Sequence, residues 1–389
     1  MRRESRTARW VVVVAAALTL ALPACGGPPQ PKARCPVRPG GSPIAYVTRA
    51  GRVIPIRTDT NMTCRAIAIP GGGADRFRLL ITPDGKTVYV GTDSGGLAPI
   101  HTATSTAGKV IPFKGTASPA FTPDSKTLYV VTFSKNERLE VVPVDTVTSR
   151  RGKPMLIHGA RAASTWMGVA GRTLYVLVGG TAWIQRFDTA TNRPERPASL
   201  RREKVQDSPP VPAALSDTTL YIGHGRMVIP VSTSSGKPGK PISLASTVGG
   251  LAYAHAAGTP GGNAVYAILD NDSLVPISTA TNTTGKAITE IGKDDLKVTF
   301  TPDGKIALVL SGNGKLTWIR TATSKVIRSV SLPPLAGKEL AVSYMAVTPD
   351  GKTLYLRREE HPMLAIQVAT GQVRHPFSLD LISPIVISP

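Results

Sequence analysis

The chain has few acidic residues, few aromatic residues and almost no cysteine. It holds 25 aspartates and glutamates against 46 lysines and arginines, so its formal charge is +21. Aromatic residues make up 5% of the sequence, with four tryptophans among them. Three cysteines and six histidines without metal-ligand spacing give no indication of a metal site.

The sequence also has no apolar stretch near its N-terminus long enough to cross a bilayer as a helix. The run from Trp10 to Leu22 has 13 residues, and four arginines precede it. A positive segment followed by a short apolar run is typical of a secretory signal. We therefore expect residues 1–24 to be a signal peptide, followed by a linker at 25–42 that is rich in proline and glycine.

The residues after the apolar run resemble a bacterial lipobox. They read Leu22-Pro23-Ala24-Cys25. The resemblance implies cleavage before Cys25 and a diacylglycerol on its thiol, which anchors the protein on the outer face of the cell membrane. The alternative is an ordinary secretory signal with a chance cysteine. Cys35 and Cys64 then remain, and an oxidising compartment favours a disulfide between them over two free thiols.

The positive charge predicts an anionic partner. Residues 1–24 contain four arginines and one glutamate, so their removal leaves a charge of +18. Outside the cytoplasm the candidates are phospholipid head groups, wall polymers and acidic polysaccharide, whereas nucleic acid is not expected. Residues 149–204 alone hold eleven basic residues against three acidic ones. The alternative is a basic surface without a specific partner.

A tyrosine recurs in near-identical surroundings through the rest of the chain. The steps between successive copies are 43, 40, 46, 46, 45, 42 and 47 residues, counting Leu308 as the one substitute. A period of about 44 with four short apolar runs indicates blades of a β-propeller. The copies are Tyr46, Tyr89, Tyr129, Tyr175, Tyr221, Tyr266, Leu308 and Tyr355.

The two ends of the repeat region predict how the ring closes. The first repeat begins at Pro43 without room for an innermost strand, and the chain ends on an isolated copy of that strand, Ile385 to Pro389. We therefore expect an all-β propeller over 43–389 with eight four-stranded blades, and seven as the alternative. The last strand should complete the first blade and leave no open edge.

The repeat motif resembles that of the YVTN-repeat β-propellers. Its residues are Pro-Asp-Gly-Lys-Thr, then Val-Tyr-Val or Leu-Tyr-Val, and later Thr-Ala-Thr. The resemblance implies a secreted or surface-attached protein, although members of that family often have seven blades. It does not identify a function, because the propeller fold carries both enzymes and binding proteins.

We expect a monomeric binding or scaffolding module rather than an enzyme, with a propeller lactonase or lyase as the alternative. The blade motif of quinoprotein dehydrogenases has a tryptophan where this chain has Ile111, Ile242 and Ile288, so we expect no cofactor. Acidic, basic and histidine side chains should meet on the channel face, where turns and inter-blade connections converge. The candidate ligand-binding residues are Arg76, Asp93, Arg161, His224, Arg226, Asp272, Asp295 and Arg358.

The lipobox gives the first testable prediction. Cys25→Ser removes the thiol that would carry the lipid, so the protein should leave the membrane fraction or stay unprocessed. Fractionation of cells followed by immunoblotting measures this, with Cys64→Ser as the control that keeps the lipobox. Wild-type membrane association of Cys25→Ser would contradict the lipid anchor.

Overall fold

The computed structural model describes most of the chain after residue 31. It leaves out residues 1–31, 72–73, 115–116, 135, 158–164, 179–182, 201–210, 217, 254–263, 295, 333–343, 358–361 and 378–383. The predicted signal peptide and Cys25 lie outside the described residues.

The described residues form strands and no helix. The first four blades contain β1 (Ile44–Arg49), β2 (Arg52–Arg57), β3 (Met62–Thr63), β4 (Ile67–Ala68) and β32 (Val386–Ile387); β5 (Ala74–Ile81), β6 (Thr87–Thr92), β7 (Leu97–His101) and β8 (Thr106–Ala107); β9 (Ala117–Phe121), β10 (Thr127–Phe133), β11 (Leu139–Asp145) and β12 (Met155–Leu156); and β13 (Thr165–Ala170), β14 (Thr173–Val178), β15 (Trp183–Asp188) and β16 (Arg193–Ser199). The last four contain β17 (Val211–Leu215), β18 (Thr219–His224), β19 (Met227–Ser232) and β20 (Ile242–Ser243); β21 (Val248–Tyr253), β22 (Ala264–Leu269) and β23 (Leu274–Ser278); β24 (Lys297–Phe300), β25 (Ile306–Leu310), β26 (Lys315–Arg320) and β27 (Lys325–Ser331); and β28 (Met345–Val347), β29 (Thr353–Leu356), β30 (Met363–Gln367) and β31 (Val373–Phe377).

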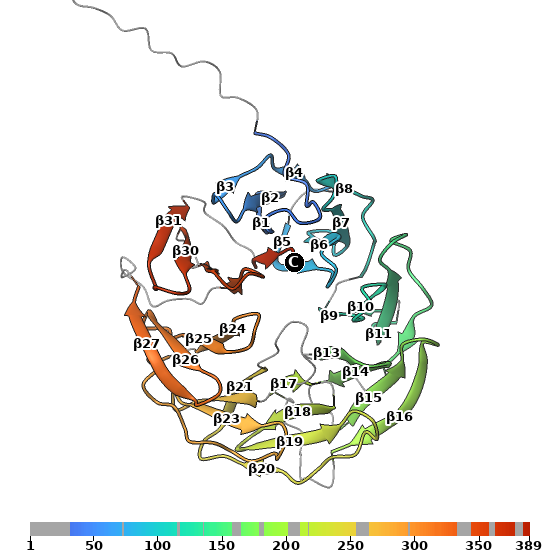
Figure 1. Ribbon diagram of the computed structural model, residues 1–389. Coiled ribbons are helices and arrows are strands. Elements are labelled where there is room, and N and C mark those ends of the chain that lie inside the picture. The colour runs from blue at the N-terminus through green and yellow to red at the C-terminus, as the bar shows by residue number, and fades with distance from the viewer. Residues whose placement is uncertain are drawn as a thin grey trace, which may run out of the picture. The chain divides into compact units, whose positions relative to one another are not determined.

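These strands make eight antiparallel sheets that follow one another around a ring (Figure 1). Seven sheets contain a path of four hydrogen-bonded strands. The sheet of blade six has three, and isolated bridges at Thr284 and Ile288 mark the place of its fourth. The all-β propeller predicted from the repeat is confirmed, and its sheets number eight.

Eight hydrophobic clusters join the blades in pairs. Each cluster is built from the facing sides of two successive blades, as where Tyr89 and Leu97 of blade two pack with Leu128 and Val142 of blade three. The last cluster joins blade eight to blade one. Burial between blades is thus continuous around the ring, and it supplies the main force that holds the blades together.

The C-terminal strand completes blade one as predicted. Val386 pairs with Tyr46 and Ile387 with Ala45, so β32 is the innermost strand next to β1. Ser388 is fully buried, and its hydroxyl accepts the N–H of Ile44 at 2.8 Å. First and last segments of the repeat region therefore share one sheet.

The Thr-Pro-Asp-Gly-Lys turn recurs because its side chains satisfy its own backbone. In blade two the hydroxyl of Thr82 donates to Asp84 at 2.7 Å and accepts the N–H of Thr87 at 3.1 Å. The same carboxylate accepts the N–H of Lys86 at 3.1 Å. Gly85 has a φ of +69°, which glycine adopts without steric cost. The motif is thus a local turn.

The recurring tyrosine connects each blade to the next one. Tyr175 is fully buried, and its hydroxyl donates to the carbonyl of Thr233 in blade five at 2.6 Å. Six of the seven tyrosines donate to the equivalent turn of the following blade: Tyr89, Tyr129, Tyr175, Tyr221, Tyr266 and Tyr355. Burial raises the pKa of Tyr89 and of Tyr129 to about 12, so both remain donors at neutral pH.

Blade seven makes the same connection with a different residue. Leu308 replaces the tyrosine, and Trp318 lies opposite it on the neighbouring strand. The indole Nε1–H donates to the carbonyl of Val368 in blade eight at 2.9 Å. The hydrogen bond between blades is therefore kept although the tyrosine is absent.

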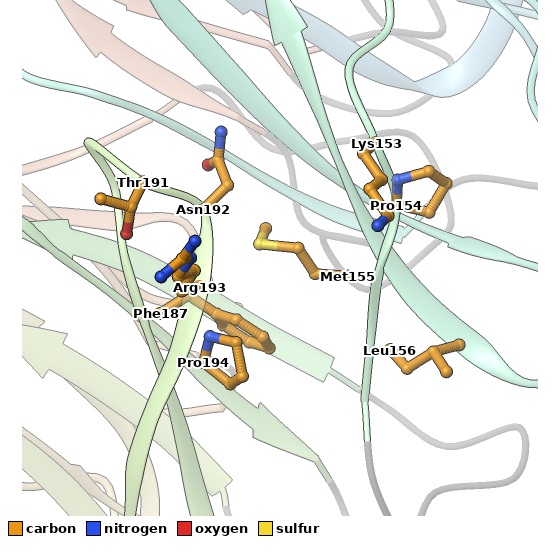
Figure 2. A pocket seen from close by; sticks show the side chains of 9 residues that line it. All are labelled: Lys153, Pro154, Met155, Leu156, Phe187, Thr191, Asn192, Arg193 and Pro194. Carbon is orange, nitrogen blue, oxygen red and sulfur yellow. The ribbon is translucent and has the colours of Figure 1, made fainter.

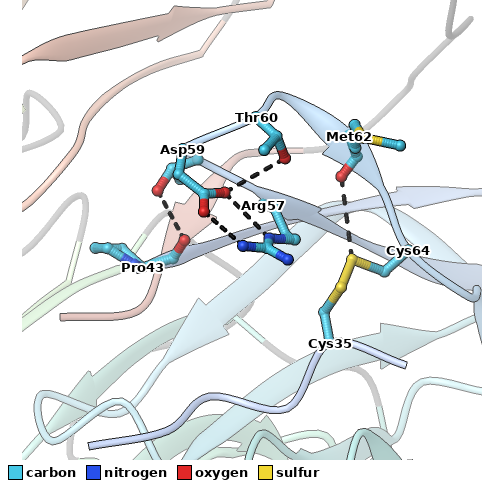
Figure 3. Close-up of a disulfide and its surroundings, with 8 residues drawn as sticks. Cys35, Pro43, Arg57, Asp59, Thr60, Met62 and Cys64 are labelled. Carbon is cyan, nitrogen blue, oxygen red and sulfur yellow. Dashed lines mark hydrogen bonds and ion pairs between the residues drawn. A yellow bond between two sulfur atoms is a disulfide. The ribbon is translucent and has the colours of Figure 1, made fainter. Parts of the chain in front are cut away.

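Blade one is the exception, and the segment before the propeller explains it. The predicted disulfide between Cys35 and Cys64 is present, with Cα atoms 5.9 Å apart (Figure 3). It holds the preceding segment against the joint between blades one and two, where Cys35 and Val37 pack on the hydrophobic cluster. The N–H of Val37 donates a hydrogen bond to the carbonyl of Thr102 at 3.0 Å. The buried hydroxyl of Tyr46 has no hydrogen-bond partner among the residues that the structure describes.

This difference among the tyrosines predicts opposite effects of one substitution. Tyr175→Phe leaves the carbonyl of Thr233 without its donor and should lower the free energy of unfolding by about 1–3 kcal/mol. Tyr46→Phe removes an unpaired buried hydroxyl and should leave stability unchanged or higher. Thermal unfolding of both variants tests this, and an equal loss in Tyr46→Phe would contradict it.

Ring closure predicts a second stability effect. Ser388→Ala removes the acceptor of the buried Ile44 N–H and should cost about 1–3 kcal/mol. Ser234→Ala, at an exposed serine, is the control and should cost less than about 0.5 kcal/mol. Equal thermal midpoints for the two variants would contradict closure through Ser388.

Candidate functional site

The predicted channel face is where turns between second and third strands meet the connections between blades. Backbone hydrogen bonds join the two kinds of segment there. Gly225 in the turn of blade five accepts the N–H of Val248 at 2.8 Å, and Gly51 in the turn of blade one accepts that of Ile69 at 3.1 Å. These bonds fix the face on which ligands of propellers are expected.

The structure describes four of the eight predicted ligand-binding side chains. Asp93 is exposed in the turn of blade two, and His224, Arg226 and Asp272 lie in or beside the turns of blades five and six. Residues Arg161, Asp295 and Arg358, and the side chain of Arg76, lie outside the described part of the chain. The ligand-binding set therefore stays a prediction.

Two of the four side chains hold backbone in place. The guanidinium of Arg226 donates to the carbonyl of Ala245, and a carboxylate oxygen of Asp272 accepts the N–H of Asp294 at 2.8 Å. No hydrogen bond or ion pair joins the four described side chains to one another. His224 differs, because its Nδ1 is buried and has no hydrogen-bond partner in the described part of the chain. Within the described residues, no group of three or more histidine, cysteine or acidic side chains is placed to hold a metal ion.

A pocket lies at the outer rim between blades three and four. Its volume is about 550 Å³. Figure 2 shows one wall from blade three and one from the turn and outer strand of blade four. The lining residues are Lys153, Pro154, Met155, Leu156, Phe187, Thr191, Asn192, Arg193 and Pro194.

The inner part of the pocket is apolar. Met155 and Phe187 are 6% and 2% exposed and belong to the hydrophobic cluster that joins the two blades. Leu156 is 47% exposed beside them. Asn192 is already used, because its side-chain oxygen accepts the hydroxyl of Tyr129 at 2.8 Å. The floor of the pocket can therefore hold an apolar group of a ligand, but it has few polar atoms left to form hydrogen bonds with that ligand.

The outer part of the pocket is cationic. Lys153 and Arg193 are exposed, and neither forms an ion pair with a described residue. Two neighbouring arginines are compensated: Arg172 pairs with Asp188 at 3.2 Å and Arg186 with Glu195 at 2.9 Å. The basic segment 149–204 thus separates into paired arginines and free cations. Arg161, Arg201, Arg202 and Lys204 of that segment are not among the described residues.

The sequence indicated the basic segment but not the pocket. The pocket exists because residues distant in the chain, Lys153 and Arg193, come from different blades that pack together. The repeat alignment assigns each residue to a strand, but it does not show how two outer edges meet. Which arginines of the basic segment form ion pairs is also visible only in the structure.

No protein-family model and no curated protein sequence matches this chain. Solved structures do match, with low identity. Dihydro-heme d1 dehydrogenase NirN has a TM-score of 0.69 at 14% identity, over 90% of this chain and 77% of that one. Apo AztD from Citrobacter koseri has a TM-score of 0.64 at 10% identity, over 89% and 98%. At such identities the likeness establishes the propeller fold alone.

Proposed function

We propose that this protein is a lipid-anchored binding module of the cell envelope that takes an anionic ligand in the rim pocket of blades three and four. The observation that carries the proposal is the pair Lys153 and Arg193, two exposed cations above an apolar floor that have no ionic partner among the described residues. Such a site favours a ligand with a negative head and an apolar body.

The N-terminal sequence supports the proposed address. The lipobox-like residues at 22–25 directly follow the apolar run, and the resemblance to YVTN-repeat propellers implies a secreted or surface-attached protein. The Cys35–Cys64 disulfide agrees with an oxidising compartment. Within the described residues, no helix is long and apolar enough to cross a membrane. The lipid proposed on Cys25 would attach the protein to the membrane.

A propeller enzyme is the second candidate. NirN, a structural neighbour, is named a dehydrogenase, and His224 has a buried nitrogen without a partner on the channel face. An essential acid or base contributes about 10²–10⁴ in rate. A hydrolytic or lyase activity of the purified protein that His224→Gln reduces by that amount would favour the enzyme.

Binding of octyl phosphate tests the pocket. Calorimetric titration should detect octyl phosphate but much weaker binding of inorganic phosphate, which cannot use the apolar floor. Arg193→Gln should weaken octyl phosphate binding about tenfold, equivalent to about 1.4 kcal/mol. Arg172→Gln is the control of equal charge change, since Arg172 is already paired with Asp188. Equal affinities for the two variants would refute the pocket as the site.

A further inference from the structure

The outermost strand of most blades contains the same two-residue bulge. In blade two the carbonyl of Pro99 accepts the N–H of Gly108 at 2.7 Å, and the ladder resumes where Ile111 bonds Leu97. The two residues between, Lys109 and Val110, are skipped. Proline has no N–H to donate. At the place where the ladder is interrupted, it therefore costs the sheet no hydrogen bond.

The first residue of this bulge is basic in six successive blades. In blade four Arg186 pairs with Glu195 and Ile184 with Ala198, which leaves Arg196 in the bulge. In blades one, three, five and six, the residue just before the bulge donates its N–H to the carbonyl of a proline, as in blade two. The six residues, named the rim belt here, are Arg65, Lys109, Lys153, Arg196, Lys240 and Lys286, and all are exposed.

The belt ends at blade seven. There Leu316 pairs with Val330 and Trp318 with Arg328, so the ladder is continuous where the other blades have the two-residue bulge. Its register shifts instead between Trp318 and Ile319. Blade eight has the bulge again between Arg374 and Phe377. Its first residue is a histidine, whose side chain lies outside the described residues. The cations therefore follow one continuous arc of the ring, from blade one to blade six.

None of the belt cations forms an ion pair within the described part of the chain. The other recurring lysines do. Those of the Thr-Pro-Asp-Gly-Lys turns, one of which has Ser125 in place of glycine, each pair with the aspartate of their own turn, at 3.3, 3.9, 3.5 and 3.7 Å. These turn lysines are Lys86, Lys126, Lys305 and Lys352. Both sets arise from the repeat, but only the belt keeps its charge uncompensated.

We propose that the rim belt binds a linear polyanion that runs along the outer strands of blades one to six. Evenly repeated like charges on successive blades match a partner whose negative charges also repeat. A flat membrane meets one sector of a ring at a time, whereas a flexible chain follows the arc. Many weak contacts then act together, because each bound unit raises the effective concentration of the next.

This inference rests on the proposed function for the sign of the ligand, and it adds a surface distinct from the pocket. Only Lys153 belongs to both. A polymer of the envelope whose repeating unit carries phosphate or carboxylate has the required chemistry. Such a chain would meet the belt at several blades, while a small anionic ligand would need only the pocket.

Binding of inorganic polyphosphate to the mature, disulfide-bonded protein tests the belt. Affinity should rise steeply with length between chains of about 3 and about 100 phosphates. The triple variant K109Q/K240Q/K286Q should weaken binding of the long chain at least about tenfold and reduce the slope of log affinity against log salt by about two to three. The matched control K86Q/K126Q/K305Q loses the same charge from paired lysines and should change affinity less than about twofold.

Equal losses in both triple variants would overturn the belt, because only net charge would then matter. Binding independent of chain length would overturn it as well. Loss of anionic-vesicle binding in the belt variant with polyphosphate binding intact would assign these cations to a membrane surface instead. Octyl phosphate separates the two proposals: failure of wild-type protein to bind it would refute the pocket and leave the belt standing.

Discussion

The fold depends on the closure of a ring of eight sheets. The ring closes in blade one, where the two ends of the repeat region pair with each other. Each blade buries one face against the next, so an open ring would expose two apolar faces and two strand edges. Blade one closes the ring with β32 on its inner side, where Ser388 binds the backbone of Ile44. On its outer side the disulfide holds the preceding segment over the joint with blade two. The connection from blade one to blade two, which within the described residues lacks the tyrosine hydrogen bond found in six other blades, is thus the one next to the disulfide.

Much of the fold could be predicted from the sequence, because every blade repeats the same local solution. The tyrosine period predicted eight blades, the isolated C-terminal copy predicted closure, and the two cysteines left after the lipobox predicted the disulfide. The role of the tyrosine was not predictable. Its hydroxyl bonds the following blade. In blade seven, where Leu308 replaces the tyrosine, the role of Trp318 as the substitute donor becomes visible only when both donors are seen to reach the same kind of carbonyl.

The candidate site was harder to predict for a physical reason. Sequence shows which residues are basic but not which are neutralised. Arg172 and Arg186 looked equivalent to Lys153 and Arg193 in the sequence. The first two have acidic partners, whereas the last two have none within the described segments. The channel-face residues illustrate the opposite case, since Arg226 and Asp272 hold neighbouring backbone segments. Among the described residues, Lys153 and Arg193 are thus exposed cations on the rim without an ionic partner, and for this reason we place the proposed anionic ligand there.

The most direct measurement is lysine-reactive footprinting of the mature protein with and without long-chain polyphosphate, read by peptide mass spectrometry. The account predicts that Lys109, Lys240 and Lys286 are protected together on three separate blades, while the turn lysines Lys86, Lys126 and Lys305 keep their reactivity. Protection spread evenly over both sets, or confined to a single blade, would contradict a polyanion bound along the rim.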